Sequence, residues 1–330
     1  MLRIHFGTED LNRLRVAAGP DPLWETVHSL HLLQNRQAAL VFDPWRREVR
    51  AALAKAGLTE TVAALHRLCP WAEYFPDFLT PGQGIDDLET GIEQVLSVPI
   101  RRLGREIGHL YPGTRPLPPG ARSLAGGDPR TLSGLGDALR RYHAVAVAPY
   151  AGEIRTVVAA DRLVRADAAL NAGPGGLLTS YQPDLAWRGD RLESAYPVAK
   201  ELALEGRALT LIPSFFCVRS PVALADHELP PVLVHPLTPA PGWLARSRAT
   251  DPAQLPVGQL IGPTRATVLD ALERPLTTTQ IGEALRITLS TASRHATVLR
   301  ESGLVTSERR GSAVVHTRSR LGDALMDGRL

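Results

Sequence analysis

The amino-acid sequence predicts an α+β protein of two domains, and three observations support that prediction. Apolar residues recur at helical spacing between about residues 21 and 171. Residues about 1–20 and 177–236 are strand-rich, with apolar and polar positions alternating, which indicates a small antiparallel sheet. A Pro-rich stretch at about 236–257 then separates these segments from a C-terminal pattern of short helices and a hairpin. We therefore expect a mostly helical N-terminal domain with a small antiparallel sheet, followed by a separate C-terminal domain.

Length and composition agree with this organisation. A chain of 330 residues has room for two domains, which we place at 1–250 and 258–330. The apolar fraction of 44% suits ordinary cores, and no run reaches the roughly 18 apolar residues of a membrane span. The first residues lack the apolar core of a signal peptide, and Cys69 and Cys217 are too few and too far apart to indicate a disulfide framework. We expect a cytoplasmic protein with no membrane partner.

The N-terminal domain begins with strand-like residues and continues with helices. Weak alternation around the turn-like segment Gly7–Asp10 predicts a β-hairpin over the first twenty residues. Asp21-Pro22 and Asp43-Pro44 are helix start signals, because an aspartate caps the helix and proline fits its first position. Helices are predicted at 23–33, 45–56, 59–68, 85–110 (one helix, or two with a break near Pro99), 132–147 and 150–171. Pro112–Asp128 is rich in Pro and Gly and is predicted to be a surface loop.

The pattern then changes from helix to strand. Strands are predicted at 185–188, 200–205, 208–217 and 231–235, with glycines or Asp226 at the turns. Because apolar and polar residues alternate along them, we expect an antiparallel meander with one face buried. The N-terminal hairpin could join the same sheet.

The last quarter of the chain has the order of a winged helix-turn-helix. Leu260–Leu272 has the spacing of a helix, and Thr277 with Gln280 forms a capping box before a second helix. Thr288 can cap a third helix, which Gly303 ends. Two strands then form a hairpin, at Val305–Arg309 and Ser312–Thr317 with Arg310-Gly311 at the turn. The second and third helices would pack as a helix-turn-helix, with the hairpin as the wing.

Polar residues occupy the first two turns of the third helix, where a recognition helix meets DNA. Hydroxyls suit phosphate and short base contacts, and an arginine can bind guanine through two hydrogen bonds. Arginines on a hairpin can reach the minor groove or the DNA backbone. The predicted DNA-binding residues are Thr288, Ser290, Thr291, Ser293, Arg294, His295, Arg309, Arg310 and Arg318. The alternative is an ordinary solvated face of a small helical domain, and His295 could instead be a packed residue that bonds a neighbour.

The charge distribution favours the DNA interpretation. From Gln259 onward the chain has ten arginines, no lysine and seven acidic residues, which accounts for its whole net charge of +3. This is mild for a nucleic-acid binder, and a dimer would double it. The spacing of Leu260–Leu272, and that of Leu321, Leu325 and Met326, would allow either segment to pair across a two-fold axis.

Ser293–His295, Val298–Val305 and Arg309–Ser312 together resemble the ArsR/SmtB class of winged-helix transcriptional regulators. The resemblance covers about the last seventy residues. It implies a homodimer, a palindromic double-stranded DNA operator and repression. It also places Ser290, Thr291, Arg294 and His295 at DNA-reading positions, and Arg309 and Arg310 on the wing.

The sequence departs from the metal-sensing members of that class. Their cysteine-rich motif would fall on Glu283–Ile287, which contains no Cys, and the terminal segment Leu321–Met326 contains no His. Because tight binding of soft metals needs thiolate or imidazole ligands, we expect no metal site there and no cofactor.

The N-terminal region resembles the large N-terminal part of actinobacterial ArsR-type proteins. The resemblance lies in Pro22–Thr26, Asp77–Pro81, Ile212–Phe216 and Leu229–Val234. It implies no activity. Three interpretations remain for this region: an effector-binding domain, a dimerisation domain or scaffold that recruits another protein, and an enzyme.

The enzyme interpretation has the least support. The sequence has no Gly-x-Ser-x-Gly elbow and no phosphate loop, and Ser214 and Cys217 lie on a predicted strand without an evident base. Glu25, His28 and His31 share a helix face and could hold a metal, although solvated histidines on an amphipathic helix are the favoured alternative.

Aromatic residues favour a small organic effector. The candidate ligand-binding residues are Trp24, Trp71, Tyr74, Phe75, Phe78 and Trp187, and aromatic walls with few polar groups suit such ligands. The alternative is that these rings fill a core or a domain interface. The sequence thus predicts a non-enzymatic, sequence-specific DNA-binding regulator, with a DNA-bound scaffold as the alternative.

Overall fold

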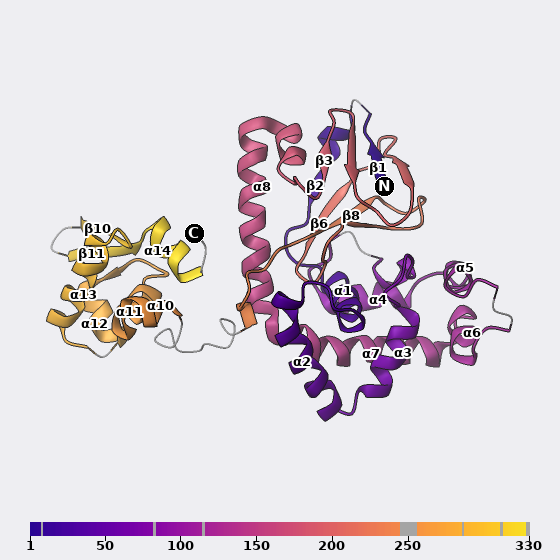
Figure 1. Cartoon of the computed structure of the whole chain (residues 1–330), viewed down its shortest axis with the longest axis horizontal. Coiled ribbons are helices and arrows are strands. Elements are labelled where there is room, and N and C mark those ends of the chain that lie inside the picture. The colour runs from indigo at the N-terminus through magenta and orange to yellow at the C-terminus, as the bar shows by residue number, and fades with distance from the viewer. Residues whose placement is uncertain are drawn as a thin grey trace. The chain divides into compact units, whose positions relative to one another are not determined.

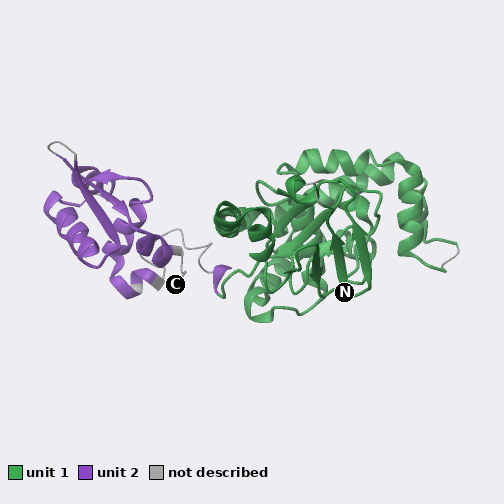
Figure 2. Ribbon diagram, turned by 90° about the horizontal axis from the view of Figure 1, so that it is seen from above, with its two compact units in different colours: residues 1–241 green, residues 242–330 purple. Residues whose placement is uncertain are grey.

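The chain folds into two compact units, Met1–Pro241 and Gly242–Leu330 (Figures 1 and 2). The structure, a computed structural model, describes residues 1–7, 9–81, 84–113, 116–244, 256–285, 287–310 and 313–327, without the side chains of Pro256, Gln259, Arg310 and Asp327. The division between the units falls in the Pro-rich stretch, of which 245–255 lie outside the described residues. Within the described residues, no helix is long and apolar enough to cross a membrane.

Helices make up most of the N-terminal unit (Figure 1). They are α1 (Pro22–Gln34), α2 (Ala39–Lys55), α3 (Thr59–Leu68), α4 (Leu88–Leu96), α5 (Ile100–Leu110), α6 (Pro119–Ala125), α7 (Pro129–Ala146) and α8 (Ala151–Thr179), with 3-10 turns η1 (Asp10–Arg13), η2 (Asp77–Leu79) and η3 (Ala148–Tyr150). The predicted bounds of α3 are confirmed, and so is the break at Pro99 between α4 and α5. Asp21 caps α1 as expected, since its carboxylate accepts from the N–H groups of Leu23 and Trp24.

Two helix predictions are wrong, and proline explains both. Pro44 does not start α2 but lies inside it. Pro44 has no N–H to donate to the carbonyl of Leu40 one turn earlier, and Leu40 is 79% exposed, so water can reach this part of the helix. The predicted loop at 112–128 contains α6. Pro119 at the first position of α6 and Gly126 just after its end act as start and stop signals rather than as loop residues.

Among the described residues of the N-terminal unit, eight strands form two four-stranded sheets, with the orders β3-β4-β1-β5 and β2-β6-β8-β7. The strands are β1 (Leu2–His5), β2 (Arg15–Val16), β3 (Ala186–Trp187), β4 (Arg191–Ser194), β5 (Lys200–Ala203), β6 (Thr210–Ser214), β7 (Val222–Ala223) and β8 (Val232–Pro236). Alternation along the strands correctly predicted a sheet in this region, but two features of its topology differ from the prediction.

The predicted N-terminal hairpin is wrong, because β1 and β2 belong to different sheets. The turn η1 separates them, and its Asp10 accepts hydrogen bonds from the N–H groups of Gly7 and Gly206, which redirects the chain. The antiparallel meander is also wrong, because β1 pairs β5 in parallel and β6 pairs both β2 and β8 in parallel. Parallel pairing joins strands that are distant in sequence, so local alternation does not reveal it.

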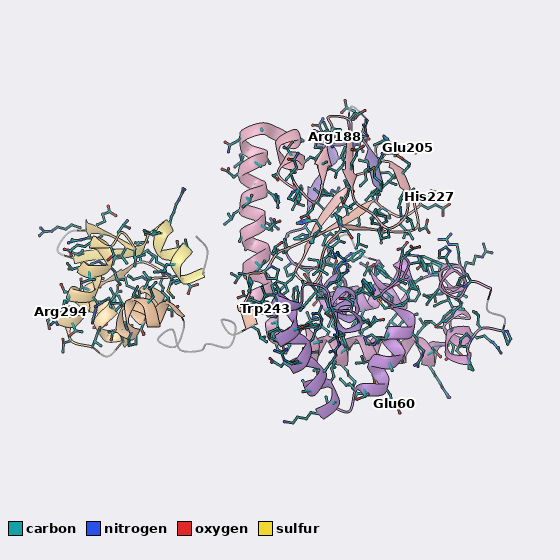
Figure 3. All side chains as sticks on the ribbon, viewed as in Figure 1. Glu60, Arg188, Glu205, His227, Trp243 and Arg294 are labelled. Carbon is teal, nitrogen blue, oxygen red and sulfur yellow. The ribbon has the colours of Figure 1, made fainter. Side chains whose placement is uncertain are left out.

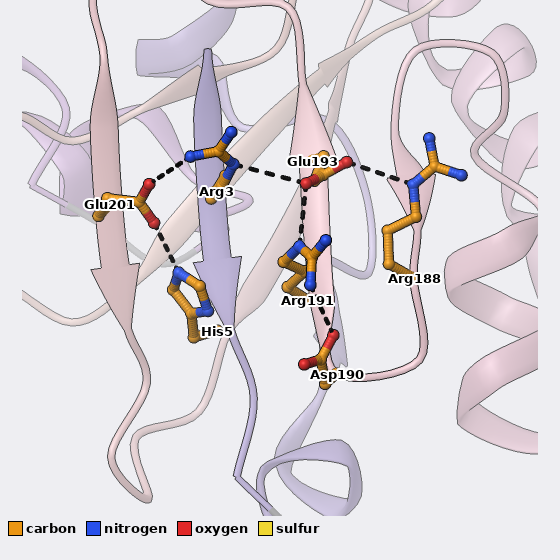
Figure 4. Close-up of polar contacts among 7 residues, drawn as sticks. All are labelled: Arg3, His5, Arg188, Asp190, Arg191, Glu193 and Glu201. Carbon is orange, nitrogen blue, oxygen red and sulfur yellow. Dashed lines mark hydrogen bonds and ion pairs between the residues drawn. The ribbon is translucent and has the colours of Figure 1, made fainter.

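The register of the first sheet aligns opposite charges across neighbouring strands. Arg3 of β1 lies opposite Glu193 of β4 and Glu201 of β5, and forms ion pairs with both, at 3.5 and 2.9 Å (Figure 4). Arg188 and Arg191 also pair with Glu193. Because the side chains that pair with the half-buried Glu193 are exposed, the network fixes register more than it adds stability.

Helix α1 lies in the core of the N-terminal unit. Ten of its 13 residues are buried, including Glu25 and His28. Its Trp24 packs against Ile212, Val232 and Val234 of the second sheet. The prediction of an amphipathic helix with solvated histidines is therefore wrong, because this helix is covered on nearly every side.

The C-terminal unit contains α10 (Pro256–Ile261), α11 (Pro263–Ala271), β9 (Leu276–Thr277), α12 (Thr278–Leu285), α13 (Leu289–Glu301), β10 (Val305–Arg310), β11 (Ala313–Arg318) and α14 (Arg320–Asp327). Its sheet has the order β10-β11-β9. The prediction of one helix over Leu260–Leu272 is wrong, because Gly262 has a non-helical φ of +90° and separates α10 from α11. The predicted capping box is confirmed, since Thr277 Oγ1 accepts from the Gln280 N–H and Gln280 Oε1 accepts from the Thr277 N–H. Gly303 has the left-handed conformation (φ +73°) that ends α13.

Candidate functional site

Helix α13 has an apolar core face and a mostly polar water face. Ala292, Ala296 and Leu299 are buried in the core of the C-terminal unit, whereas Ser293 and Arg294 are exposed. Arg294 extends from the surface of this unit (Figure 3). Apart from Leu289, which is 57% exposed at the start of the helix, the exposed residues of the first two turns are polar ones that the sequence singled out.

Hydroxyl groups gather at the amino end of α13. Thr288 caps the helix, and its Oγ1 accepts from the Thr291 N–H at 3.2 Å. The same Oγ1 lies 3.0 Å from Ser290 Oγ and 2.8 Å from Thr291 Oγ1. A helix N-terminus carries partial positive charge and free N–H groups, so this cluster suits a phosphate oxygen.

His295 lies beside positive charge. Partial burial lowers its pKa, and the nearby arginines Arg265 and Arg294 lower it further. Arg265 belongs to α11 and was not predicted, because helical spacing along α11 does not reveal which residues of α13 it approaches. The amino half of α13 and the side of α11 that carries Arg265 together form a positively charged surface.

The wing is a regular hairpin joined to α12 through a buried histidine. Six residue pairs link β10 and β11, and Arg309 is exposed, whereas the Arg310 side chain lies outside the described residues. His316 is buried and bonds Ser307 Oγ through Nδ1 (2.8 Å) and Thr278 Oγ1 through Nε2 (2.9 Å). This contact between the wing and α12 was not predicted from the sequence.

Arg318 is engaged within the C-terminal unit. Its guanidinium donates to the carbonyls of Leu269 (2.9 Å) and Asp270 (2.8 Å) at the end of α11, and lies 3.6 Å from a carboxylate oxygen of Asp323. A cation at a helix C-terminus is favourable. The arrangement connects the end of the wing to α11. Fewer of the guanidinium N–H groups of Arg318 are therefore available to bind DNA than the sequence predicts.

Comparison with known proteins gives a match to the part of the chain that contains α13. A family model described as a helix-turn-helix domain matches residues 260–308, which span α11, α12, α13 and the first wing strand. A comparison with curated proteins finds no match, and neither does a comparison with solved structures. The match and the fold together indicate a DNA-binding transcription regulator with a winged helix-turn-helix.

A second group of polar residues is buried in the N-terminal unit. The Glu25 carboxylate accepts from the N–H groups of Phe215 (2.7 Å) and Phe216 (3.1 Å) and from the Ser214 hydroxyl (3.1 Å). Ser214 Oγ also lies 2.9 Å from Nδ1 of His28. Burial raises the pKa of Glu25 to about 7, although these hydrogen bonds oppose the shift.

Sequence reasoning missed that His28 lies beside Ser214, because 186 residues separate them. Even so, the hydroxyl is not an available nucleophile. It is fully buried, donates to Glu25 and also accepts from the Cys217 N–H at 3.3 Å. Glu25 and the histidines do not converge as a metal site either, and within the described residues no group of three or more such side chains could hold a metal ion.

The N-terminal unit contains a cleft of about 750 Å³. This cleft is lined by α1 and by residues from 71–77, 195–200 and 216–225. Of the six aromatic residues predicted to bind a ligand, Trp71, Tyr74 and Phe75 line it. Trp24 and Phe78 are instead buried in the core, and Trp187 packs against Phe6 on the first sheet at 5.1 Å.

Proposed function

We propose that this protein is a sequence-specific transcriptional repressor that reads double-stranded DNA with the amino half of α13. The observation that supports it best is the division of α13, whose core face is apolar and whose water face carries Ser290, Ser293 and Arg294. Recognition helices present this end to the major groove, with base contacts from arginine and phosphate contacts from hydroxyls. Arg309 and Arg310, on the wing, are proposed to contact the flanking backbone or minor groove.

The test is DNA binding by the full-length protein, measured by fluorescence anisotropy with duplexes from the region upstream of its own gene and from a random-sequence selection. We expect one preferred sequence and an affinity that falls as salt rises from about 50 to 200 mM, because phosphate contacts release counterions. Absence of salt-sensitive binding to every selected duplex would refute the proposal. A reporter gene downstream of the selected site then distinguishes repression from activation.

We also propose a homodimer. One recognition helix covers half a site, and two placed about 34 Å apart read a palindrome. Leu260 of α10 (72% exposed) and Leu321 of α14 (48% exposed) flank the DNA-reading helices. In the N-terminal unit, Leu163 and Leu170 of α8 are 72% and 87% exposed and lie seven residues apart, a spacing typical of helix pairs. Sedimentation at micromolar concentration should give a dimer, and a monomer that binds a half-site at full affinity would contradict this.

DNA binding is proposed to be independent of metal. The positions where metal-sensing relatives carry cysteine or histidine are Glu283–Ile287 and Leu321–Met326, and these contain neither. Adding Zn²⁺ or a chelator should leave operator affinity unchanged. A tenfold shift, equivalent to about 1.4 kcal/mol, would reveal an overlooked site.

The N-terminal unit is proposed to bind a small organic effector in the cleft. Its volume lies within the range of small-molecule sites, and aromatic side chains line it together with a few polar ones. If the unit were only a scaffold for another protein, small molecules that occupy the cleft would not change operator affinity. Operator binding measured with and without a cleft ligand therefore separates the two functions.

A further inference from the structure

We propose that the cleft binds a small aromatic monoanion that also carries a hydrogen-bond donor, and that Arg219 binds its negative charge. The proposal rests on the effector role proposed above and specifies the chemistry of the effector. All of the residues that line the cleft belong to one compact unit, so the site needs no other part of the chain.

Large apolar side chains in the cleft are exposed to solvent. Trp71 is 51% exposed and Val198 is 39% exposed, although residues of this size are usually covered in a folded domain. Tyr74 and Phe75 also line the cleft and are half-buried. Flat rings stack well on such surfaces, so these side chains favour an aromatic ligand.

The charges in the cleft favour an anion. Arg219 is exposed and forms no hydrogen bond or ion pair with any residue that the structure describes. The other cation of the lining, Lys200, donates to the Leu224 carbonyl, and its charge is offset by Asp77. A free guanidinium binds a carboxylate or sulfonate through two parallel hydrogen bonds.

The acidic residues of the lining limit the charge of that anion. Asp77 accepts from the N–H groups of Ala225 and Asp226, at 3.0 and 2.7 Å, so its carboxylate is satisfied by the protein itself. Glu73 is exposed and would repel a second negative charge on the ligand. A single negative charge therefore fits the cleft better than two.

The backbone holds Arg219 in an unfavourable conformation. Its φ is +72°, and the N–H of Ser220 donates to the Val218 carbonyl at 3.0 Å across it, which makes a tight three-residue turn. An arginine in this region is strained, and the surrounding structure must hold it there. Such strain is concentrated at ligand-binding positions, where it fixes the place of one side chain.

His28 supplies the second requirement, a donor on the ligand. With Glu25 ionised, the single Ser214 hydroxyl proton goes to the carboxylate, so His28 must donate its Nδ1–H to Ser214 Oγ. The Nε2 atom of His28 then carries no proton. It is buried and has no hydrogen-bond partner within the described residues, although His28 lines the cleft. An O–H or N–H group of a ligand would satisfy it.

Two fluorescent probes with the same aromatic skeleton test the charge requirement. The anion 8-anilinonaphthalene-1-sulfonate has a sulfonate and an N–H, whereas N-phenyl-1-naphthylamine lacks the sulfonate. Titrated against the full-length protein at pH 8, where Glu25 is mostly ionised, the anion should bind at one site and at least about tenfold more tightly than the neutral probe. Equal affinities, or no binding of the anion, would overturn the proposal and leave DNA binding unaffected.

Three variants locate the anion. Arg219→Gly removes the guanidinium and relieves the strained backbone, so it should remain folded and weaken the anion about tenfold while changing the neutral probe by less than about threefold. Arg219→Lys should retain part of the preference for the anion. Arg141→Ala removes an exposed arginine outside the cleft lining and should change neither probe. Unchanged affinity of the anion in Arg219→Gly would overturn the role of Arg219.

The donor requirement can be tested without a substitution. In a protein labelled with ¹⁵N-histidine, the unprotonated Nε2 of His28 should give a resonance typical of a bare imidazole nitrogen, and bound 8-anilinonaphthalene-1-sulfonate should shift it as hydrogen bonds do. A protonated Nε2 at pH 8, or a resonance that the probe does not shift, would overturn this part of the proposal.

Discussion

Helices α1 and α13 have the same length, 13 residues, and both begin with a side-chain cap, yet the structure uses their polar residues in opposite ways. In α1, Glu25, Thr26, His28 and Ser29 are all buried, most of them bonded to other parts of the N-terminal unit. In α13, the polar side chains point to water or bond one another.

The comparison shows why residue type alone does not identify a functional helix. Serine, threonine, histidine and a charged residue occur in both helices, and only their burial separates a polar group that holds the fold together from one that is free to meet a partner. Removing a polar group should therefore cost stability in α1 and DNA affinity in α13.

The largest effect is expected for Glu25→Ala. The substitution leaves three donors of Ser214, Phe215 and Phe216 without their acceptor in a buried site, and each unsatisfied group costs about 1–3 kcal/mol. Relief of the buried charge offsets part of this, so we expect a loss of about 3 kcal/mol in the free energy of unfolding of the N-terminal unit, measured by urea denaturation with tryptophan fluorescence. The exposed Glu93 serves as the control, and Glu93→Ala should leave the midpoint unchanged.

Arg294→Ala should have the opposite profile. The exposed guanidinium packs against little of the protein, so unfolding should not change, whereas loss of a base contact should weaken binding to the preferred duplex by about 1–3 kcal/mol. Arg300→Ala, an exposed arginine in the last turn of the same helix, is the matched control and should cost less. If both variants lost the same affinity on every duplex, Arg294 would contribute only charge and not sequence recognition.

Thr288→Ala tests a residue that has both roles. Its hydroxyl caps α13, and removing such a cap costs about 1 kcal/mol of stability. We expect faster hydrogen exchange at the Thr291 amide and a uniform loss of DNA affinity across sequences. Thr288→Ser keeps the capping oxygen and should restore both. A stable Thr288→Ala protein with unaltered exchange would show that the hydroxyl cluster does not hold the end of the helix.

Local signals allowed the sequence to predict much of this architecture. Caps and periodicity identified α1, α3, α12 and α13, because a capping box such as Thr277 with Gln280 acts over three residues. The polar face of α13 followed from the same local pattern. Contacts between residues that are distant in the sequence leave no such local pattern. The parallel pairing of β6 with β8, and the meeting of His28 with Ser214, depend on how whole elements pack.

The candidate sites show the same limit. Of the six predicted aromatic ligand residues, the three that line the cleft come from one short stretch, 71–75. The sequence gives no sign of the role of Arg219, because nothing in its neighbours marks a strained turn. For Arg318, its position at the end of the wing is the one sequence feature that predicts DNA contact. Its bonds to the end of α11 arise from tertiary packing, which the hairpin pattern does not encode.

The smallest expected effect concerns pH and His295. Partial burial and two arginines hold its pKa below the ordinary value of 6.5, so the free protein carries this side chain neutral at pH 7. A nearby DNA phosphate would favour the protonated form and raise the pKa in the complex. Affinity should therefore increase as pH falls through the interval between the two pKa values, by at most about tenfold, and the gain should disappear as pH rises above the pKa of the complex.

Anisotropy titrations between pH 5 and 8 at constant ionic strength measure this pH dependence of DNA affinity, and His295→Gln is expected to flatten the profile. His316 also has a lowered pKa, but both of its ring nitrogens are bonded to hydroxyls, so it should contribute little. If His295→Gln retained the full pH dependence, His295 would be a packed residue of α13 rather than part of its DNA-facing surface.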